Sequence, residues 1–376
     1  MTVLLDTHEI LDRLAETIRV QGQDCDRDDT FVAKNLLLLK EAGLYRAMIP
    51  EELGGGGISH SAMCQFLREL ARFCGATALT LSMHQHLVAV QVFNYRNGKP
   101  AEAMLRRIAA EDLILVSTGG GDWLSSNGEA ERVEGGYRVS CVKHFASGAP
   151  IADIAVMSCA YTDEQGDEFV IHCGIPFSDP GVTILDNWEA MGMRGSGSHS
   201  VRIDRVFVPD EKIPLIRPRG AWHPVWEVVC TFAFPLFMAP YVGVAEAMKQ
   251  RVLELLDGTR AGAAVAASLG EMDNQLRIAQ LALEDMIRQV DDGRVKPSLE
   301  TANRAMTGKA LISIAAREAA AKAMEAAGGR AFMRRSGLEK LFRDVWAAEF
   351  HPIQASRQRE LAGRIMLGGT PADLAD

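Results

Sequence analysis

The sequence lacks the cysteine patterns that hold structural metals or build disulfide frameworks. Its seven cysteines are scattered along 376 residues, with no CxxC pair and no matching His/Cys spacing. This argues against a zinc site and a disulfide scaffold, and it is typical of a reduced compartment. We therefore expect a cytoplasmic protein without a structural metal.

The chain also lacks a long uninterrupted apolar run and an excess of positive charge. The run CTFAFPLFMAPYVGVAEAM is broken by Pro235 and Pro240, which favours a buried helix over a membrane span. The amino terminus MTVLLDTHEILDRLAETIRV has no signal-peptide core. With a net charge of -9, no nucleic-acid surface is indicated. We expect a soluble protein with no membrane or nucleic-acid partner.

Several common catalytic motifs are missing as well. The sequence contains no GxSxG, GxxxxGK[ST] or HExxH motif. Its glycine runs lack the strand and helix context of a dinucleotide-binding turn. These absences argue against a serine hydrolase, a P-loop nucleotide enzyme and a zinc peptidase.

Apolar spacing divides the chain into three parts of different texture. Segments such as FVAKNLLLLKEAGLYRAMI predict helices over residues 1–112. GYRVSCVKHFASG, DEFVIHCGIPF and SVRIDRVFV alternate apolar and polar residues, and predict strands of an antiparallel sheet or barrel over 113–219. Helical periodicity returns over 220–376, with one helix expected from Ser298 to the glycine pair Gly328 and Gly329. The fold class is α+β.

Four segments, in the same order, resemble the acyl-CoA dehydrogenase superfamily. They are GLYRAMIPEELGGGG, VEGGYRVSCVKHFASGAPIADIAVM, MGMRGSGSHSVRIDRVFVP and AAGGRAFMRRSGLEKLFRD. The resemblance implies an amino-terminal helical domain, a middle β-barrel and a carboxy-terminal four-helix bundle that mediates homotetramers. It also implies a flavin between barrel and bundle, FAD in the first place with FMN as the alternative.

The resemblance assigns residues to that flavin. Ser117 and Thr118 match one barrel loop of the family, and a second loop supplies Phe145, Ala146 and Ser147. Gly328 and Gly329 match a further cofactor segment, and Arg194 and Ser196 lie in the glycine-rich turn beside the substrate. From the residues alone, Ser117 and Thr118 could equally end a strand, Phe145 could be core, and Arg194 could be a solvated turn residue.

The carboxylate base of a family dehydrogenase is missing from both of its usual places. In RDVWAAEFHPIQ, Pro352 stands where the base is expected, and Glu349 is the nearest substitute. The arginine motif that grips the cofactor diphosphate in many members is absent after LLDGTR. These departures weaken the expectation of ordinary acyl-CoA dehydrogenation.

Flavin monooxygenases of the superfamily lack the same glutamate and receive reduced flavin from a reductase. Several carry a His eight residues after the Arg of RD and a Ser in the SG of the barrel loop, which His351 and Ser147 match. His84 or His86 could add a third polar group from the amino-terminal part. An imidazole and a hydroxyl beside the flavin could hydrogen-bond bound oxygen species and block proton leakage. Alternatively, His351 ends a helix and His84 packs inside one.

Three hypotheses remain at this point. The first is a monooxygenase that uses reduced flavin and oxygen on a small organic substrate, with a flavin reductase or other electron-transfer partner. The second is an acyl-CoA dehydrogenase with a displaced base, Glu349. The third is a non-catalytic relative that binds flavin or acyl-CoA. The missing glutamate and the presence of His351 favour the first.

Overall fold

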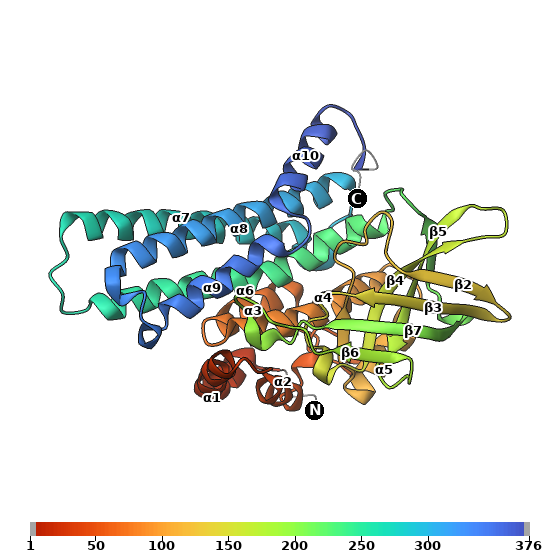
Figure 1. Cartoon of the computed structure of the whole chain (residues 1–376), viewed down its shortest axis with the longest axis horizontal. Helices are drawn as coiled ribbons and strands as arrows, with labels where there is room; N and C mark the ends of the chain where they lie inside the picture. The colour runs from red at the N-terminus through yellow and green to blue at the C-terminus, as the bar shows by residue number, and fades with distance from the viewer. Residues whose placement is uncertain (1–4, 372–376) are drawn as a thin grey trace.

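The computed structural model describes residues 5–371 as two helical parts on either side of a β-sheet in the chain. Figure 1 shows a long helical bundle at one end of the molecule and the sheet at the other, with α4 between them and α3 beside the bundle. This arrangement confirms the α+β fold class expected from the sequence. A cofactor or substrate held where sheet and bundle meet would therefore contact all three parts.

The amino-terminal part consists of five α-helices. They are α1 (Thr7–Asp28), α2 (Ala33–Glu41), α3 (His60–Ala71), α4 (Gly75–Arg96) and α5 (Glu102–Glu111). Helix α4 is buried along most of its length, including polar residues such as Thr80, His84 and His86. Buried polar groups need partners, so these residues are candidates for structural or functional contacts.

The sheet contains eight strands in the path β6-β7-β3-β2-β4-β5-β8, with β1 paired to β4. Most pairs are antiparallel, but β4 runs parallel to both β1 and β2. Strand β7 alternates buried and exposed residues over most of its length, as a strand with one covered face requires. Their bounds are β1 Leu115–Ser117, β2 Glu129–Val133, β3 Gly136–Lys143, β4 Ile154–Thr162, β5 Glu168–Pro176, β6 Val182–Leu185, β7 Ser200–Pro209 and β8 Leu215–Pro218.

The carboxy-terminal part is a bundle of four long or medium helices followed by α10. The bounds are α6 Val225–Leu256, α7 Ala263–Val290, α8 Leu299–Ala327, α9 Leu338–Phe350 and α10 Ala355–Met366. Helix α8 begins at a capping box formed by Ser298 and Thr301 and ends before Gly328, as the sequence predicts. Helix α6 is apolar enough to cross a membrane, but 94% of its most apolar window is buried inside the protein. It is the central core helix that the sequence suggests.

Candidate active site

His351 lies directly after α9, where the bundle meets the sheet. Its Nε2 atom is 2.6 Å from the hydroxyl of Tyr241, a fully buried residue of α6. The Phe237 ring, one turn earlier on α6, stacks on the imidazole with centroids 5.0 Å apart. No hydrogen bond to Nδ1 comes from any residue that the structure describes, so this atom remains available for a ligand.

The surroundings keep this imidazole neutral. Burial, followed by repulsion from Lys309 and from His86 when that ring is protonated, lowers the pKa of His351 to about 3. Burial and, less strongly, the Asp344 charge raise the pKa of Tyr241 well above its ordinary value, so the phenol keeps its proton. Among residues 5–371, Nε2 of His351 is the one hydrogen-bond partner of this hydroxyl. The hydroxyl is therefore best assigned as the donor, which places the imidazole proton on Nδ1.

His86 on α4 is a second neutral imidazole in the same region. Burial, and then repulsion from His84 when that ring is protonated, lower the pKa of His86 to about 3. The side chain is 6% exposed, and its Nδ1 atom is buried without a hydrogen-bond partner in the described chain. An unpaired buried donor or acceptor of this kind costs about 1–3 kcal/mol. A bound polar ligand would remove that cost.

Ser147 belongs to a buried row of hydroxyls. Its Oγ lies 2.7 Å from Ser198 Oγ, which in turn lies 2.7 Å from Ser196 Oγ. The loop that follows β3 is docked on this row by the amide of Gly148, which donates to Ser196 O at 3.0 Å. The structure thus brings together two predicted residues, Ser147 and Ser196, and adds Ser198.

Helix α4 passes both the serine row and the imidazole pair. Thr80 approaches this loop, because an added Cβ on Gly148 would lie 2.8 Å from its methyl group. His86 follows six residues later and interacts electrostatically with His351. Six residues correspond to about 9 Å along a helix axis. Helix α4 therefore runs from the loop that holds Ser147 toward the imidazole pair.

The loop after β1 meets the turn that holds His351. Ser117 is the last residue of β1, and the Thr118 hydroxyl donates to Val156 O at 3.2 Å. Two residues on, an added Cβ on Gly120 would lie 3.0 Å from Pro352, so the glycine permits this close approach. The predicted residues Ser117 and Thr118 are thereby placed next to the His351 turn.

Phe145 and Ala146 differ in exposure. Ala146 is fully buried, and its amide donates to His199 O at 3.0 Å. Phe145 has a positive φ of 57° and leaves its ring 65% exposed, edge-on to Trp188. A strained residue that presents a bare aromatic ring is a candidate ligand contact.

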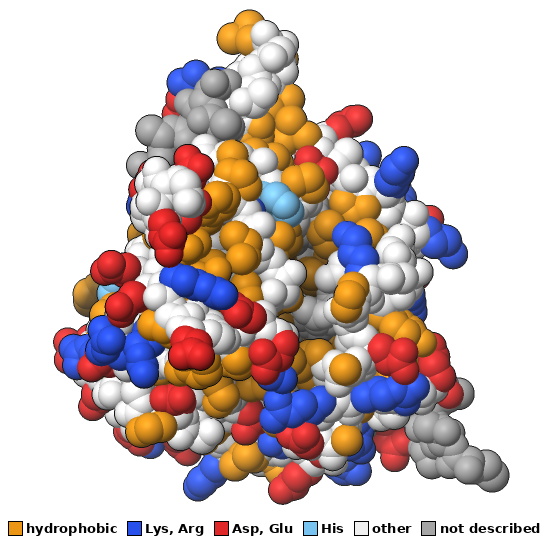
Figure 2. Space-filling model, turned by 90° about the vertical axis from the view of Figure 1, so that its right-hand side faces the viewer, with side chains coloured by type: hydrophobic (Ala, Val, Ile, Leu, Met, Phe, Trp, Pro, Cys, Tyr) orange, Lys and Arg blue, Asp and Glu red, His pale blue; other side chains and the backbone are white. Residues whose placement is uncertain are grey.

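This set of groups fits a flavin ring. The isoalloxazine is flat and uncharged, and its carbonyl and nitrogen atoms call for neutral donors and an apolar or aromatic wall. The described site offers neutral His86 and His351, the Ser147 hydroxyl and the exposed ring of Phe145. Figure 2 shows hydrophobic side chains gathered around a histidine on the sheet end of the molecule, beside a depression of the surface.

His84 is engaged elsewhere. Its Nε2 lies 2.7 Å from Tyr45 O, and its Nδ1 accepts from the amide of Leu115 at 3.0 Å. Both ring nitrogens therefore tie α4 to the start of β1. Burial lowers the pKa of His84 to about 4, so it stays neutral there. Of the two histidines considered in LSMHQHLV, His86 is the one with a free nitrogen.

Glu349 points away from His351. Its carboxylate accepts from Ser313 Oγ at 2.9 Å and pairs with Arg317 at 2.8 Å, both on α8. His351, two residues later, faces Tyr241 on α6 instead. A general base must reach the proton that it removes, and this carboxylate is held by two side chains of α8.

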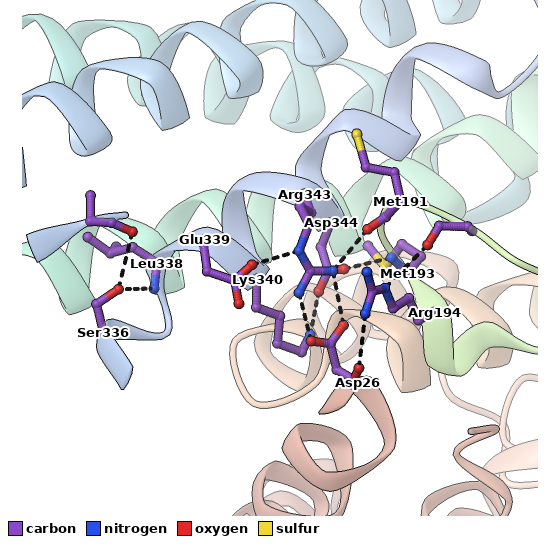
Figure 3. A network of polar contacts seen from close by, with 12 residues as sticks. Asp26, Met191, Met193, Arg194, Ser336, Leu338, Glu339, Lys340, Arg343 and Asp344 are labelled. Carbon is purple, nitrogen blue, oxygen red and sulfur yellow. Dashed lines mark hydrogen bonds and ion pairs between the residues drawn. The ribbon is translucent and has the colours of Figure 1, made fainter. Parts of the chain in front are cut away.

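Arg194 takes part in a network that joins the three parts of the chain (Figure 3). Its guanidinium donates to Ala190 O at 3.3 Å and reaches Asp26 O at 3.5 Å. Arg343 binds the same Asp26 through two bonds, of 2.7 and 3.2 Å, and Asp344 accepts from the amide of Met193 at 2.6 Å.

The charge balance of this network favours ion pairs. Burial by itself would raise the pKa of Asp26, but the hydrogen bonds from Arg343 and the neighbouring positive charges lower it overall. Arg343 and Asp344 therefore fasten α1 and the glycine-rich turn to α9. Arg194 serves this junction in the structure, although it precedes Ser196 of the serine row by only two residues.

Gly328 and Gly329 are not brought to the same place. They follow α8 at the end of the bundle remote from the sheet (Figure 1), and helix α9 separates them from His351. Thirteen helical residues span roughly 20 Å. Within one chain, these glycines cannot line the ring site described above.

Sequence reasoning missed Tyr241 and Ser198. Tyr241 is the single tyrosine in an apolar run, and a phenol hydroxyl in a helix buried all round is a signal for a specific partner. Ser198 lies in GSGSHS, and its contacts with Ser147 and Ser196 depend on the conformation of this loop. That conformation could not be predicted from the composition of the segment.

Comparison with known proteins matches three sequence profiles of one family along most of the chain. They are the acyl-CoA dehydrogenase N-terminal domain at residues 8–112, the middle domain at 117–206 and a C-terminal domain at 236–355. A putative acyl-CoA dehydrogenase, YdbM of Bacillus subtilis, is 28% identical over 92% of each chain. The oxygenase component of p-hydroxyphenylacetate 3-hydroxylase from Acinetobacter baumannii is 26% identical over 90% of this chain and 83% of the relative. A crystal structure of KijD3 with FMN and a dTDP-sugar superimposes with a TM-score of 0.87 at 24% identity, covering 98% of this chain and 95% of the other.

Proposed function

We propose that this chain, which belongs to the acyl-CoA dehydrogenase family and is a flavin-dependent oxidoreductase, is the oxygenase of a two-component monooxygenase. The single observation that carries the proposal is the neutral His351, held by Tyr241 with Nδ1 left free, while Glu349 is paired on α8. The donor set suits oxygen chemistry, and Glu349, the carboxylate considered for proton abstraction, is already paired within the described chain.

Bound reduced flavin would supply two electrons to oxygen, so that one oxygen atom enters the substrate and the other leaves as water. The role of the chain's own residues is to position and shield. Tyr241 fixes the orientation of the imidazole, and Nδ1 of His351 donates a hydrogen bond into the site. The Ser147 hydroxyl, braced by Ser198, supplies a second donor. Because the pKa values of His351 and His86 are low, both imidazoles are uncharged at neutral pH and have no imidazolium proton to release into the site.

We further propose FMN as the flavin and a separate reductase as its source. FMN is supported by its presence in KijD3 and by the remoteness of Gly328 and Gly329, which deprives an adenosine half of partners in the same chain. The reductase is supported by the word "component" in the name of the Acinetobacter relative. A cytoplasmic location fits such a pair.

A homotetramer formed through the bundle is part of the proposal. Four large apolar side chains on α7 and α8 are 40–47% exposed, namely Ile278, Leu281, Leu311 and Ile314. Apolar side chains repeated along two neighbouring helices are typical of a buried subunit interface.

The test follows the reoxidation of reduced FMN by oxygen in the presence and absence of the protein. We expect the protein to delay both the return of oxidised-flavin absorbance and the release of hydrogen peroxide. His351→Ala should shorten the delay by about 10-fold, the worth of one good hydrogen bond in a desolvated site. Reoxidation at the rate of free FMN, or anaerobic bleaching of bound flavin by an acyl-CoA, would refute the proposal.

A further inference from the structure

An aromatic cluster adjoins the His351 site and has no role in the chemistry described so far. Trp123, in the loop after β1, stacks on Trp226 with centroids 5.6 Å apart and planes within 11°. Trp222 and Phe234 each lie with ring centroids 6.1 Å from the same residue. Three of the five tryptophans of the chain thus meet at one place.

The cluster continues to the imidazole without a break. Phe234 is 4.8 Å from Phe237 by ring centroids, and Phe237 is the ring that stacks on His351. The aromatic surface therefore runs from Trp123 along α6 to the proposed oxygenation site. Such a surface favours flat rings, because aromatic pairs gain about 0.5–1.5 kcal/mol beyond the burial of their area.

Two indole N–H groups of this cluster have no acceptor. The Nε1 atoms of Trp222 and Trp226 are buried and unpaired among residues 5–371, and the Trp226 side chain is only 9% exposed. Buried tryptophan N–H groups ordinarily find a partner. Two orphans on adjacent rings indicate an acceptor that the chain itself does not supply.

The polar side chains nearest to the cluster, Arg217 and His172, do not supply the missing acceptor. Arg217, which is 1% exposed, donates to His172 Nε2 at 3.1 Å. Burial, then the Arg217 charge, lowers the pKa of His172 to about 3. His172 is therefore a neutral ring whose acceptor nitrogen is already used.

The position of Trp123 is fixed from both sides by buried cations. Arg217 donates to Leu124 O at 2.8 Å and to Asp122 O at 3.0 Å. The Asp122 carboxylate pairs with Lys143, which is also 1% exposed. The backbone on both sides of Trp123 is thus held, although the three residues before Asp122 are glycines. Rigid placement of this kind lowers the entropic cost of binding a ligand.

From these contacts, we infer that Trp123, Trp222 and Trp226 form the substrate-recognition wall, and that the substrate is a flat aromatic compound with an acceptor oxygen or nitrogen. The ring stacks on this wall, and the acceptor receives the N–H of Trp222 or Trp226. The inference rests on the proposed function, because it names the substrate class of the same site. Arg217 and Lys143 act as positioning residues for Trp123.

Three small probes separate stacking from hydrogen bonding. They are acetophenone, α-methylstyrene, which replaces the carbonyl oxygen by a methylene group, and cyclohexyl methyl ketone, which keeps the carbonyl but loses the aromatic ring. Binding is measured by titration calorimetry on the full chain saturated with oxidised FMN, so that no turnover occurs. We expect acetophenone to bind about 2- to 10-fold more tightly than α-methylstyrene, the worth of one neutral hydrogen bond.

Variants assign each effect to a residue. Trp226→Phe and Trp222→Phe, singly and together, keep a ring and remove the N–H, so the preference for acetophenone over α-methylstyrene should disappear in the double variant. Trp123→Leu should weaken both aromatic probes by about 10-fold and leave the cyclohexyl ketone unchanged. Trp346→Phe is the matched control, because this indole lies on α9 against Arg317 and outside the cluster.

Equal binding of the three probes, no binding of any, or an equal effect of Trp346→Phe would overturn the inference. Circular dichroism verifies that each variant is folded, and the single Trp→Phe variants retain the test if the double variant is not. Failure of the proposed function is seen separately in the FMN reoxidation assay. A protein that binds acetophenone by this pattern but does not delay reoxidation keeps the aromatic wall and loses the oxygenase role.

Discussion

The hydrogen bond between Tyr241 and His351 makes the sharpest prediction. Tyr241→Phe removes one oxygen atom and leaves the ring volume nearly unchanged, so no cavity of note forms. The lost contact is the 2.6 Å bond to Nε2, and the imidazole then keeps a buried nitrogen without a partner. Loss of one member of a buried pair costs about 1–3 kcal/mol of unfolding free energy.

The same change should affect function through the tautomer. With its Nε2 no longer bonded, His351 has no strong reason to carry its proton on Nδ1, and the ring is free to turn. A loss of about 1 kcal/mol in orientation corresponds to roughly 5-fold in rate. We therefore expect less substrate oxidised and more hydrogen peroxide released per reduced FMN consumed.

Tyr45→Phe provides the control. The Tyr45 hydroxyl is also buried, but it has no hydrogen-bond partner among residues 5–371. Removing an unpaired hydroxyl relieves a desolvation cost, so this variant should be as stable as the parent protein or more so.

Urea unfolding and a peroxide assay measure the two effects. Equal stability of the two variants would show that the Tyr241 contact contributes nothing. Loss of stability with an unchanged ratio of oxidised substrate to released hydrogen peroxide would show that the contact is structural and that His351 does not touch the reacting oxygen.

Three further predictions concern pH, α9 and the junction between the parts. The pKa values of three histidines, His86, His172 and His351, are lowered from about 6.5 in the unfolded chain to about 3 in the folded protein. The unfolded chain therefore binds protons first, so the stability is complete above pH 6.5 and is lost as the pH falls toward 3. At pH 5 each histidine should lower the free energy of unfolding by about 2 kcal/mol, measured as a fall in the urea midpoint. Glu349→Gln should leave oxygenation rates unchanged, whereas a displaced dehydrogenase base would lose nearly all activity. Arg343→Lys should lower the unfolding free energy by about 2 kcal/mol because it breaks the paired bonds to Asp26, while Arg364→Lys, in an exposed pair with Glu360, should change it by less than about 0.5 kcal/mol.

The sequence predicted the elements of the fold because their signals are local. Ser298 and the Gly328–Gly329 pair mark the ends of α8, and the alternation in SVRIDRVFV matches β7. The prolines in α6 did not mislead, since a buried core helix tolerates them where its neighbours pack tightly. Each of these features depends on residues a few positions apart.

The site could be predicted only in part because its contacts join distant segments. His351 and Ser147 were named from the resemblance, but Tyr241 lies 110 residues from its partner and no local pattern links them. Arg194 was assigned to substrate from its glycine-rich neighbours, and in the structure its guanidinium contacts the backbone of Ala190 and Asp26. A guanidinium in a loop has the same local signature in both roles.

One turn of α9 decides which chemistry the site can support. Glu349 is in the last turn of α9, whereas His351 is the extended residue that follows the helix, and their side chains have different partners. Arg317 and Ser313 take the carboxylate on the α8 side, and Tyr241 takes the imidazole on the α6 side, where the aromatic surface runs. To act as a base, Glu349 would have to leave a partly buried ion pair and cross the helix, while His351 would have to vacate its stacked place on Phe237. Each partner opposes that exchange, so the fold of a dehydrogenase here presents a neutral imidazole in place of a carboxylate.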